Sequence, residues 1–337
     1  MNKILWLCSW YPNEEDAFTG DFIQRHALAV SLKHPIHVLY VHKSQREHKK
    51  TKYTVLQRNP NLQEHIYYVS VSTGVWQKCK WLITYVWLHL QFIQKFGKPD
   101  LIHVQIPMKA GLLAWWCKMR WGIPYIVTEH YGIYNPHLAD HFKTRPFYFR
   151  WLTKWVVKHA NCLTTVSKSL GEDMQKWVYN RVYEVVPNVV DTTLFFHQER
   201  KRQAIFQFIH ISNMIPLKNV EGILLAAEKL WEIRKDFCVH FVGRVEPLYY
   251  QLAESKNLLN NVVFFVGEIS YREVALQLQQ SDALLVFSDT ESQSCVVLEA
   301  LCCGKPAIVT NIGGVKELIH AANGFLVEVR DVDSLVE

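Results

Sequence analysis

The amino-acid sequence predicts an α/β protein with two doubly wound domains, each built on a parallel sheet. Short segments rich in β-branched and aromatic residues alternate with helical segments along the chain, which is typical of parallel sheets covered on both faces. The length of 337 residues suits two domains of roughly 100–200 residues each. Residues 1–190 carry a net charge of +12 and residues 191–337 one of −6. We therefore place the domain boundary between residues 190 and 191.

The first domain is expected to begin with a buried strand and to continue as a strand–helix series. The expected strands are 4–8, 37–41, 66–71, 101–104, 125–128, 162–166 and 183–186, and the expected helices are 22–32, 77–96, 109–121, 146–160 and 167–179. The polar segment 43–63 is expected to be a loop. Eleven of the twelve tryptophans lie at or before Trp177, so this half is both basic and rich in tryptophan.

The second domain repeats the alternation after a link at residues 187–202. The expected strands are 206–211, 239–242, 262–266, 283–287 and 307–310, and the expected helices are 220–233, 248–256, 271–280, 294–303 and 314–321. Ligands of doubly wound folds bind at the carboxyl ends of the parallel strands. Residues that follow a strand are therefore the first candidates for a site.

Composition and motifs exclude several classes of protein. A chain with 49% apolar and 20% charged residues is not disordered. The eight cysteines form no CxxC pair and no cluster with zinc-ligand spacing, which predicts buried free thiols in a reducing compartment, the cytoplasm. The apolar start of the chain ends at Ser9 and Pro12 without a cleavage site, so we interpret it as a strand rather than a signal peptide.

Dinucleotide and nucleic-acid binding are also disfavoured. No G-x-G-x-x-G follows the first strand, where Ser9-Trp10-Tyr11 stands instead, and a dinucleotide-dependent dehydrogenase needs that motif. The basic half carries no RNA- or DNA-binding motif, so charge alone does not indicate a nucleic-acid partner.

The longest apolar segment, residues 81–93, is too short to span a bilayer. Lys78, Lys80, Lys95 and Lys98 flank it. Two interpretations remain: a helix packed on a sheet, or a helix whose aromatic face lies in a membrane interface.

Two carboxylates eight residues apart, Glu291 and Glu299, carry the clearest functional pattern. Ser294, Cys295 and Val296 lie between them at an expected helix N-terminus, where backbone N–H groups and the helix dipole favour a phosphate. Glu299, about one turn further in, can accept hydrogen bonds from both hydroxyls of a ribose. Glu291 can reach a sugar beyond the phosphates. The simpler interpretation is that both glutamates are solvated surface residues.

The segment 291–327 resembles retaining glycosyltransferases of the GT-B fold, glycosyltransferase family 4 (group 1). The family carries a Glu-x7-Glu motif, an Ala-x3-Gly-Lys-Pro turn, a Gly-Gly pair and a later Asn-Gly. The matching residues here are Glu291 and Glu299, Ala300 to Pro306, Gly313-Gly314 and Asn323-Gly324, preceded in order by Trp10 to Phe22, Thr128-Glu129-His130 and Pro187 to Asp191. The resemblance covers nearly the whole chain. It implies two Rossmann-like domains whose parallel sheets face each other across a cleft.

In the second domain, the resemblance assigns the donor-binding residues. It implies that Lys218 neutralises the diphosphate of a nucleotide-sugar donor, where charge builds as the nucleotide leaves. Glu291 is similar to the family residue beside the transferred sugar ring, and Glu299 to the one that binds the ribose. The Ser294–Val296 amides are expected to bind sugar or phosphate.

In the first domain, the resemblance assigns two residues. His130 is similar to the family histidine near the 6-position of the sugar and the reacting centre. Gly20 is similar to the loop glycine that lets the backbone approach the donor phosphates, since a Cβ there would block it.

The sequence also departs from the family pattern. Asn213 stands in the donor site where the family usually has arginine, so Lys218 carries the phosphates alone or another basic residue such as Arg244 helps. Asn219 and Val189 each replace a glycine. The chain stops at Leu335-Val336-Glu337 as a helix begins, whereas family members continue with further helices. We expect the second domain to be incomplete at its C-terminus; the alternative is a protein that is shorter than usual.

The expected function is retaining transfer of a sugar from a nucleotide-diphosphate sugar to a glycan or lipid-linked acceptor, in the biosynthesis of cell-surface polysaccharide or glycoconjugate. The resemblance implies no cofactor and no essential metal, because GT-B enzymes rely on helix dipoles and basic residues rather than a divalent ion. In agreement, no Asp-x-Asp motif follows an expected strand. The basic first domain is expected to bind the acceptor and to contact the anionic inner face of the membrane peripherally. Two alternatives remain: a non-catalytic nucleotide-sugar-binding protein, and a sugar-nucleotide epimerase on the same fold.

Overall fold

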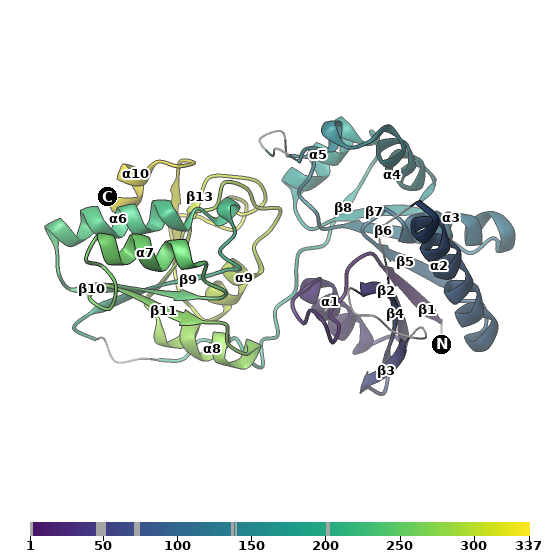
Figure 1. Cartoon of the computed structure of the whole chain (residues 1–337), viewed down its shortest axis with the longest axis horizontal. Helices are drawn as coiled ribbons and strands as arrows, with labels where there is room; N and C mark the ends of the chain where they lie inside the picture. The colour runs from purple at the N-terminus through teal and green to yellow at the C-terminus, as the bar shows by residue number, and fades with distance from the viewer. Residues whose placement is uncertain (1–2, 45–51, 71–74, 136–137, 139, 200–202) are drawn as a thin grey trace. The chain divides into compact units, whose positions relative to one another are not determined.

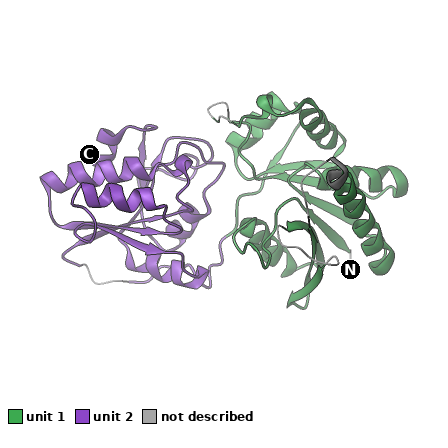
Figure 2. Cartoon of the chain, viewed as in Figure 1, with its two compact units in different colours: residues 1–189 green, residues 190–337 purple. Residues whose placement is uncertain are grey.

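The chain forms two compact units, residues 1–189 and 190–337 (Figure 2). The computed structural model describes residues 3–44, 52–70, 75–135, 138, 140–199 and 203–337. Helices surround a mainly parallel sheet in each unit (Figure 1), which confirms the predicted fold class. The boundary between the units lies one residue before the predicted one.

Over the described residues, the sheet of the first unit has eight strands in the order β3-β4-β2-β1-β5-β6-β7-β8. The strands are β1 Ile4–Cys8, β2 Ile36–Ser44, β3 Lys52–Asn59, β4 Leu62–Ser70, β5 Leu101–Gln105, β6 Tyr125–Glu129, β7 Cys162–Thr165 and β8 Glu184–Val185. Neighbours pair in parallel except β3 and β4, which pair antiparallel at the edge.

The prediction of a loop over residues 43–63 is wrong where the structure describes this segment. β2 continues to Ser44, and β3 and β4 occupy most of residues 52–63; residues 45–51 lie outside the described part. The side chains of β3 are mostly exposed, so the strand has no apolar alternation to reveal it. Backbone pairing with β4 holds it at the sheet edge.

The helices of the first unit divide between the two faces of its sheet. They are α1 Asp21–Ser31, α2 Val75–Phe96, α3 Ala110–Trp121, α4 Phe147–His159 and α5 Lys168–Trp177, with a short 3-10 helix η1 at Phe142–Thr144. Leu5 and Leu7 of β1 share one core with residues of α2, α3, α4 and α5. Trp6 and Cys8, which point the other way, share a second core with α1.

Helix α2 packs on the sheet, as the first of the two interpretations of the apolar segment 81–93 predicts, and the membrane-interface interpretation stays a prediction. Trp81, Tyr85, Leu88 and Phe92 are buried against the sheet, so this side of the helix is core. Among the helices that the structure describes, none combines the length and the apolarity needed to cross a membrane.

Within the described residues, the second unit has a six-stranded parallel sheet in the order β11-β10-β9-β12-β13-β14. The strands are β9 Phe206–Ile211, β10 Phe237–Val242, β11 Val263–Gly267, β12 Ala283–Val286, β13 Ala307–Thr310 and β14 Gly324–Val327. The helices are η2 Pro216–Lys218, α6 Val220–Ile233, α7 Pro247–Ser255, α8 Tyr271–Gln280, α9 Cys295–Cys302 and α10 Val332–Val336. One core contains residues of α6 and α7, and the other contains residues of α8 and α9.

The predicted helix at residues 314–321 is absent, and β14 follows where no strand was predicted. The segment forms turns instead, after a left-handed Gly313 with φ 46°. The Asn323 side chain donates to the Leu318 carbonyl at 2.9 Å, which closes the turns locally. β14 pairs with β13 from Gly324 onward. The strand has only four residues, which is too short for a periodic pattern to predict it.

The strand order places the predicted site residues at two switch points. In each sheet the chain leaves the first strand in one direction and later returns to the other side, so the order reverses between β1 and β5 and between β9 and β12. Doubly wound sheets bind ligands at such points. Gly20 follows β1, Lys218 follows β9, and Glu291 follows β12.

A glycine sets the separation of α3 and α4 and gives a test of the fold. A Cβ on Gly111 would lie 2.3 Å from Cγ1 of Val156, a side chain with little rotamer freedom in a helix. We expect Gly111→Ala to lower the free energy of unfolding by about 1–2 kcal/mol, since overpacking outweighs the helix propensity of alanine. Urea denaturation measures it. Adding Val156→Ala should recover part of the loss, and a stabilised Gly111→Ala would contradict the packing.

Candidate functional site

An ion pair joins the loops that follow β9 and β12 in the second unit. The Nζ atom of Lys218 lies 2.6 Å from Oε1 of Glu291, and the Ser288 hydroxyl donates to the same oxygen at 2.9 Å. The side chain of Lys218 is 24% exposed and that of Glu291 is 11% exposed. Water therefore screens their attraction less than it would at an open surface. An ammonium has three donors, so this bond leaves Lys218 capacity for an anionic ligand.

Local backbone structure positions Lys218 at the end of η2. The next residue, Asn219, is left-handed with φ 48° and caps α6 by accepting from the Gly222 N–H at 3.1 Å. Asparagine tolerates this conformation better than most residues, which explains how it stands in place of the family glycine. The Asp289 N–H donates to the Leu217 carbonyl at 2.8 Å. The loop after β12 therefore also holds the segment that carries Lys218.

Two glycines permit the close approach of backbones around this pair. A Cβ on Gly313 would lie 1.8 Å from the carbonyl oxygen of Glu291, and a Cβ on Gly243 would lie 1.8 Å from that of Ser212. Both glycines also have positive φ, so neither position accepts another residue without displacement. The Gly-Gly motif therefore serves to seat the chain against the backbone of Glu291.

A buried histidine that the sequence analysis missed ties β9 to β12 beneath the ion pair. Nδ1 of His210 lies 2.9 Å from the Leu285 carbonyl, and Nε2 lies 2.7 Å from the Ser212 hydroxyl. Burial lowers the pKa of His210 to about 4, so the ring is neutral near pH 7. Its signal in the sequence is a histidine between two isoleucines near the end of the strand.

The N-terminus of α9 lies where the sequence predicted it. Ser294 is the N-cap, Cys295 and Val296 open the first turn, and no side-chain cap closes the end. The first N–H groups of a helix have no partner within the helix, and its dipole favours anions there. This end of α9 and the Glu291 loop are consecutive in the chain, so the amides that are expected to bind sugar or phosphate and the ion pair belong to one segment.

Glu299 lies one turn further along α9 and is buried, with 3% of its surface exposed. The Tyr271 hydroxyl donates to its Oε1 at 2.9 Å, and the Tyr271 ring packs 4.9 Å from that of Phe195. The interpretation of both glutamates as solvated surface residues is therefore wrong. Sequence reasoning missed Tyr271, which comes from the separate helix α8.

Other basic and acidic candidates have simpler environments. Asn213 and Arg244 are exposed side chains that follow β9 and β10, so a helping role for Arg244 stays a prediction. The Asp-x-Asp triplet at Asp331 follows β14, where Asp331 caps α10 and Asp333 pairs with Lys229. In the described part of the chain, no group of three His, Cys, Asp or Glu residues could hold a metal ion.

In the first unit, His130 follows β6 and is buried. Its Nε2 lies 2.8 Å from Oε1 of Gln105, an atom that only accepts, so Nε2 carries the hydrogen. The rings of Phe22 and His26 lie 4.9 Å and 5.4 Å away. Burial lowers the pKa of His130 well below its ordinary value, so the ring is neutral. Its predicted place near a sugar stays a prediction.

The neighbouring Glu129 shapes the turn that carries His130. One carboxylate oxygen accepts the N–H groups of His130 and Tyr131, both at 2.9 Å, and the other accepts the Tyr134 hydroxyl at 2.6 Å. Burial raises the pKa of Glu129 to about 7. The sequence analysis used this residue only as part of a motif, although a glutamate at the end of a buried strand is itself a signal.

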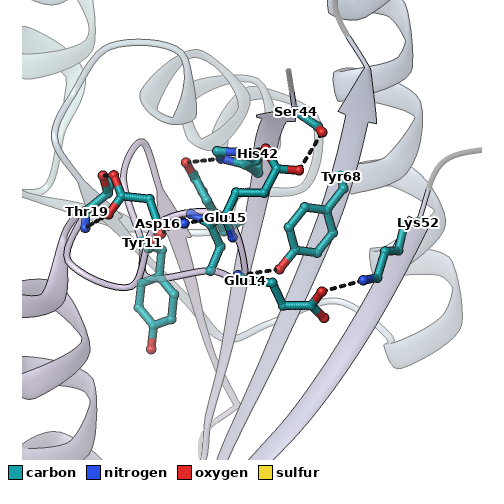
Figure 3. Close-up of polar contacts among 11 residues, drawn as sticks. Tyr11, Glu14, Glu15, Asp16, Thr19, His42, Ser44, Lys52 and Tyr68 are labelled. Carbon is teal, nitrogen blue, oxygen red and sulfur yellow. Dashed lines mark hydrogen bonds and ion pairs between the residues drawn. The ribbon is translucent and has the colours of Figure 1, made fainter. Parts of the chain in front are cut away.

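The loop after β1 is anchored to the strands beside it (Figure 3). Glu15 accepts from the Ser44 hydroxyl at 2.5 Å and lies 3.3 Å from Nε2 of His42, both on β2. Glu14 pairs with Lys52 of β3 and donates its N–H to the Tyr68 hydroxyl of β4 at 3.0 Å. Three neighbouring strands therefore hold this loop.

The same loop closes on itself at Gly20. The glycine is left-handed with φ 71°, and a Cβ there would lie 2.8 Å from the backbone carbon of Trp10. Loop closure alone therefore requires glycine at this position. The predicted approach of donor phosphates to Gly20 is a further role that stays a prediction.

The environment of Glu129 predicts a pH dependence of stability. Its pKa is about 7 in the folded chain and ordinary in the unfolded chain, so the stability gained by protonation is complete below the unfolded pKa and is lost as pH rises through about 7. Relative to Glu129→Gln, the wild-type free energy of unfolding should fall by up to about 3 kcal/mol over that range. Urea denaturation across pH measures it. Tyr134→Phe, which keeps the carboxylate, should keep the dependence; a constant difference between wild type and Glu129→Gln would contradict the assignment.

Comparison with known proteins places this geometry in a family. Residues 191–337 match the family described as Glycosyl transferases group 1, and residues 26–194 match Glycosyltransferase Family 4. N-acetyl-alpha-D-glucosaminyl L-malate synthase of Bacillus anthracis is 31% identical over 250 residues, which cover 71% of this chain and 64% of that protein. The match thus spans less than two thirds of the length of this relative.

Two solved structures share the fold. Sucrose-phosphate synthase of Thermosynechococcus elongatus has a TM-score of 0.77 at 18% identity, covering 99% of this chain and 88% of that one. The Anabaena protein HepE in complex with UDP has a TM-score of 0.73 at 15% identity, covering 100% and 88%. With the two family matches and the 31% identical relative, these findings identify the chain as a member of glycosyltransferase family 4 with the GT-B fold.

Proposed function

We propose that the protein is a retaining glycosyltransferase that moves a sugar from a nucleotide-diphosphate sugar to a glycan or lipid-linked acceptor. The observation that carries the proposal is the Lys218–Glu291 ion pair, 2.6 Å long and joined through a short loop to the N-terminus of α9. A nucleotide-diphosphate sugar has a diphosphate, a ribose and a transferred sugar. Lys218 and the helix end suit the diphosphate, the buried Glu299 suits the ribose, and Glu291 suits the sugar. HepE, which shares the fold, was solved with UDP, and this supports the choice of donor class.

Each part of the donor has a partner of suitable chemistry in this arrangement. The diphosphate binds Lys218 and the first-turn amides of α9 at Ser294, Cys295 and Val296. The ribose hydroxyls donate to Glu299, whose orientation Tyr271 maintains. The sugar donates to Glu291. The proposal therefore uses one charge for the phosphates and two carboxylates for hydroxyl groups.

The chemical step depends on stabilising the leaving group. As the bond between the anomeric carbon and the phosphate oxygen breaks, negative charge grows on the nucleotide diphosphate, and Lys218 stabilises this transition state more than the ground state. The acceptor hydroxyl attacks from the same face, and its proton passes to the departing phosphate oxygen. Retention follows without a covalent intermediate. We propose that no cofactor and no essential metal take part.

The acceptor and the cellular location follow from charge and thiol chemistry. The first unit carries the excess of positive charge, which suits an anionic or lipid-linked acceptor in cell-surface polysaccharide or glycoconjugate biosynthesis. All eight cysteines are free thiols, which favours the reducing cytoplasm. We propose that the enzyme works there, in peripheral contact with the inner face of the membrane.

One observation favours a second function, a protein that binds nucleotide sugars without transferring them. Asn213 stands where the family usually has an arginine, and it is exposed. The donor phosphates would therefore have one cation fewer to bind than in other family members. Binding of a donor without transfer to any acceptor and without hydrolysis would favour this function. An epimerase would instead change the sugar nucleotide with no acceptor present.

Removing the phosphate cation should cost most of the activity. Lys218→Ala should lower kcat/KM about 10²–10³-fold, as expected for the loss of one transition-state donor. Glu291→Ala and His130→Ala should also reduce turnover, measured as sugar transfer from a labelled donor. Lys229→Ala is the matched control, because Lys229 is an exposed lysine of the same unit paired with Asp333. Wild-type turnover in the Lys218 and Glu291 variants would refute the proposed site.

A donor screen should identify the base and test the ribose assignment. Among UDP-, GDP- and ADP-sugars, the right donor should stabilise the protein by about 2.7 kcal/mol at a hundredfold excess over its Kd, seen as a rise in Tm. Glu299→Gln should reduce this shift but leave the shift with inorganic diphosphate unchanged. Equal loss with both ligands would show that Glu299 supports the fold rather than the ribose.

A further inference from the structure

One exposed stripe of α4 combines large aromatic and basic side chains. Phe147, Trp151, Lys154 and Lys158 recur at helical spacing and are all exposed, Phe147 at 73% and Trp151 at 48%. The opposite side of the helix, including Val156, is buried in the core. The aromatic stripe is therefore not needed to pack the helix on its sheet.

Indole rings continue this surface from α4 to α3. Trp151 stacks on Trp155 with ring centroids 5.4 Å apart, and Trp155 meets Trp115 of α3 edge-on at 5.6 Å. On α3, the side chains of Met119 and Trp116 are also exposed, at 68% and 37%. The aromatic surface thus crosses two helices that pack against each other.

Helix α2 belongs to the same layer and also exposes apolar residues. Phe92 and Ile93 of α2 share one core with residues of α3 and α4, while the other buried apolar residues of α2 pack on Val41 of β2 and Val69 of β4. The exposed sides of all three helices therefore point away from the same face of the sheet. On α2 these are Leu82, Ile83, Val86 and Trp87, exposed between 40% and 69%. We call the outward surface of α2, α3 and α4 the helix-layer face.

The charge of the helix-layer face has one sign. The sequences of α2, α3 and α4 contain eight lysines and arginines and no aspartate or glutamate. A second copy of the chain would bring like charges together on this face, which disfavours a homodimer. Aliphatic and indole groups beside lysines match the boundary between lipid headgroups and acyl chains.

We propose that the helix-layer face docks on the surface of an anionic membrane. Phe147, Trp151 and Trp87 enter the headgroup region, while Lys154 and Lys158 remain with the lipid phosphates. This refines the expectation from the sequence: α2 turns Trp81 and Tyr85 into the core, and α3 and α4 supply most of the exposed aromatic surface. The proposal does not depend on the proposed glycosyltransferase activity.

Vesicle binding by the whole chain tests the proposal. The protein should co-sediment with vesicles of equal parts phosphatidylglycerol and phosphatidylcholine, and binding should weaken at high salt. Lys154→Glu with Lys158→Glu should reduce the partition coefficient at least about tenfold, since each lysine near an anionic surface contributes about 1 kcal/mol. Trp151→Ser should reduce it as well. Unchanged thermal unfolding shows that the variants fold.

Matched controls distinguish binding through the helix-layer face from nonspecific effects of net charge and of exposed apolar residues. Lys33→Glu with Lys316→Glu makes the same change of net charge at exposed positions outside the three helices, and Leu248→Ser removes an exposed apolar residue of the second unit. Both controls should bind vesicles as the wild type does.

Four results would overturn the proposal. The first is equal binding to vesicles of phosphatidylcholine alone, and the second is wild-type binding by the α4 variants. The third is a dimer in sedimentation velocity that Trp151→Ser dissociates, which would make the face a homodimer interface. The fourth is binding to a duplex RNA that is tighter than to the vesicles and is lost in the lysine variant.

Discussion

The ion pair between Lys218 and Glu291 holds the candidate site of the second unit together. It joins the loops after β9 and β12, the two strands between which the sheet order reverses. Below it, neutral His210 bonds to the backbone of β12, and beside it Gly313 lets a further loop contact the backbone of Glu291. Charges that are partly removed from water are costly to leave unpaired, so each group constrains the other until a ligand competes for it.

The ion pair and a bound ligand would compete for the same two side chains. Without a ligand, Glu291 balances the charge of Lys218. In the proposed function a diphosphate takes the lysine, and the hydroxyl groups of a sugar satisfy the carboxylate. The same two groups would then stabilise the empty site and bind the donor. This exchange explains why a cation and an anion belong together in a site for an anionic ligand.

The two units differ in how they use charge. In the second, acidic unit, the proposed anion site needs only a placed lysine and a helix end, so the net charge of −6 for residues 191–337 is no obstacle to it. In the first unit the positive charge is spread over α2, α3 and α4 beside exposed aromatic rings. Spread charge suits an extended anionic surface, whereas placed charge suits a small ligand.

The sequence alone determined the α/β class, the strands of both series except β3 and β14, and the segments that follow the switch strands, because periodicity and turn residues act locally. It also placed Ser294 at a helix N-terminus and Glu299 one turn beyond it. Tertiary structure decided what local patterns cannot encode. The edge strand β3 forms by backbone pairing alone. Tyr271, His210 and Gln105 reach Glu299, the Leu285 carbonyl and His130 from distant segments. The division of α2 into a buried and an exposed side likewise depends on which face meets the sheet, and only packing determines that.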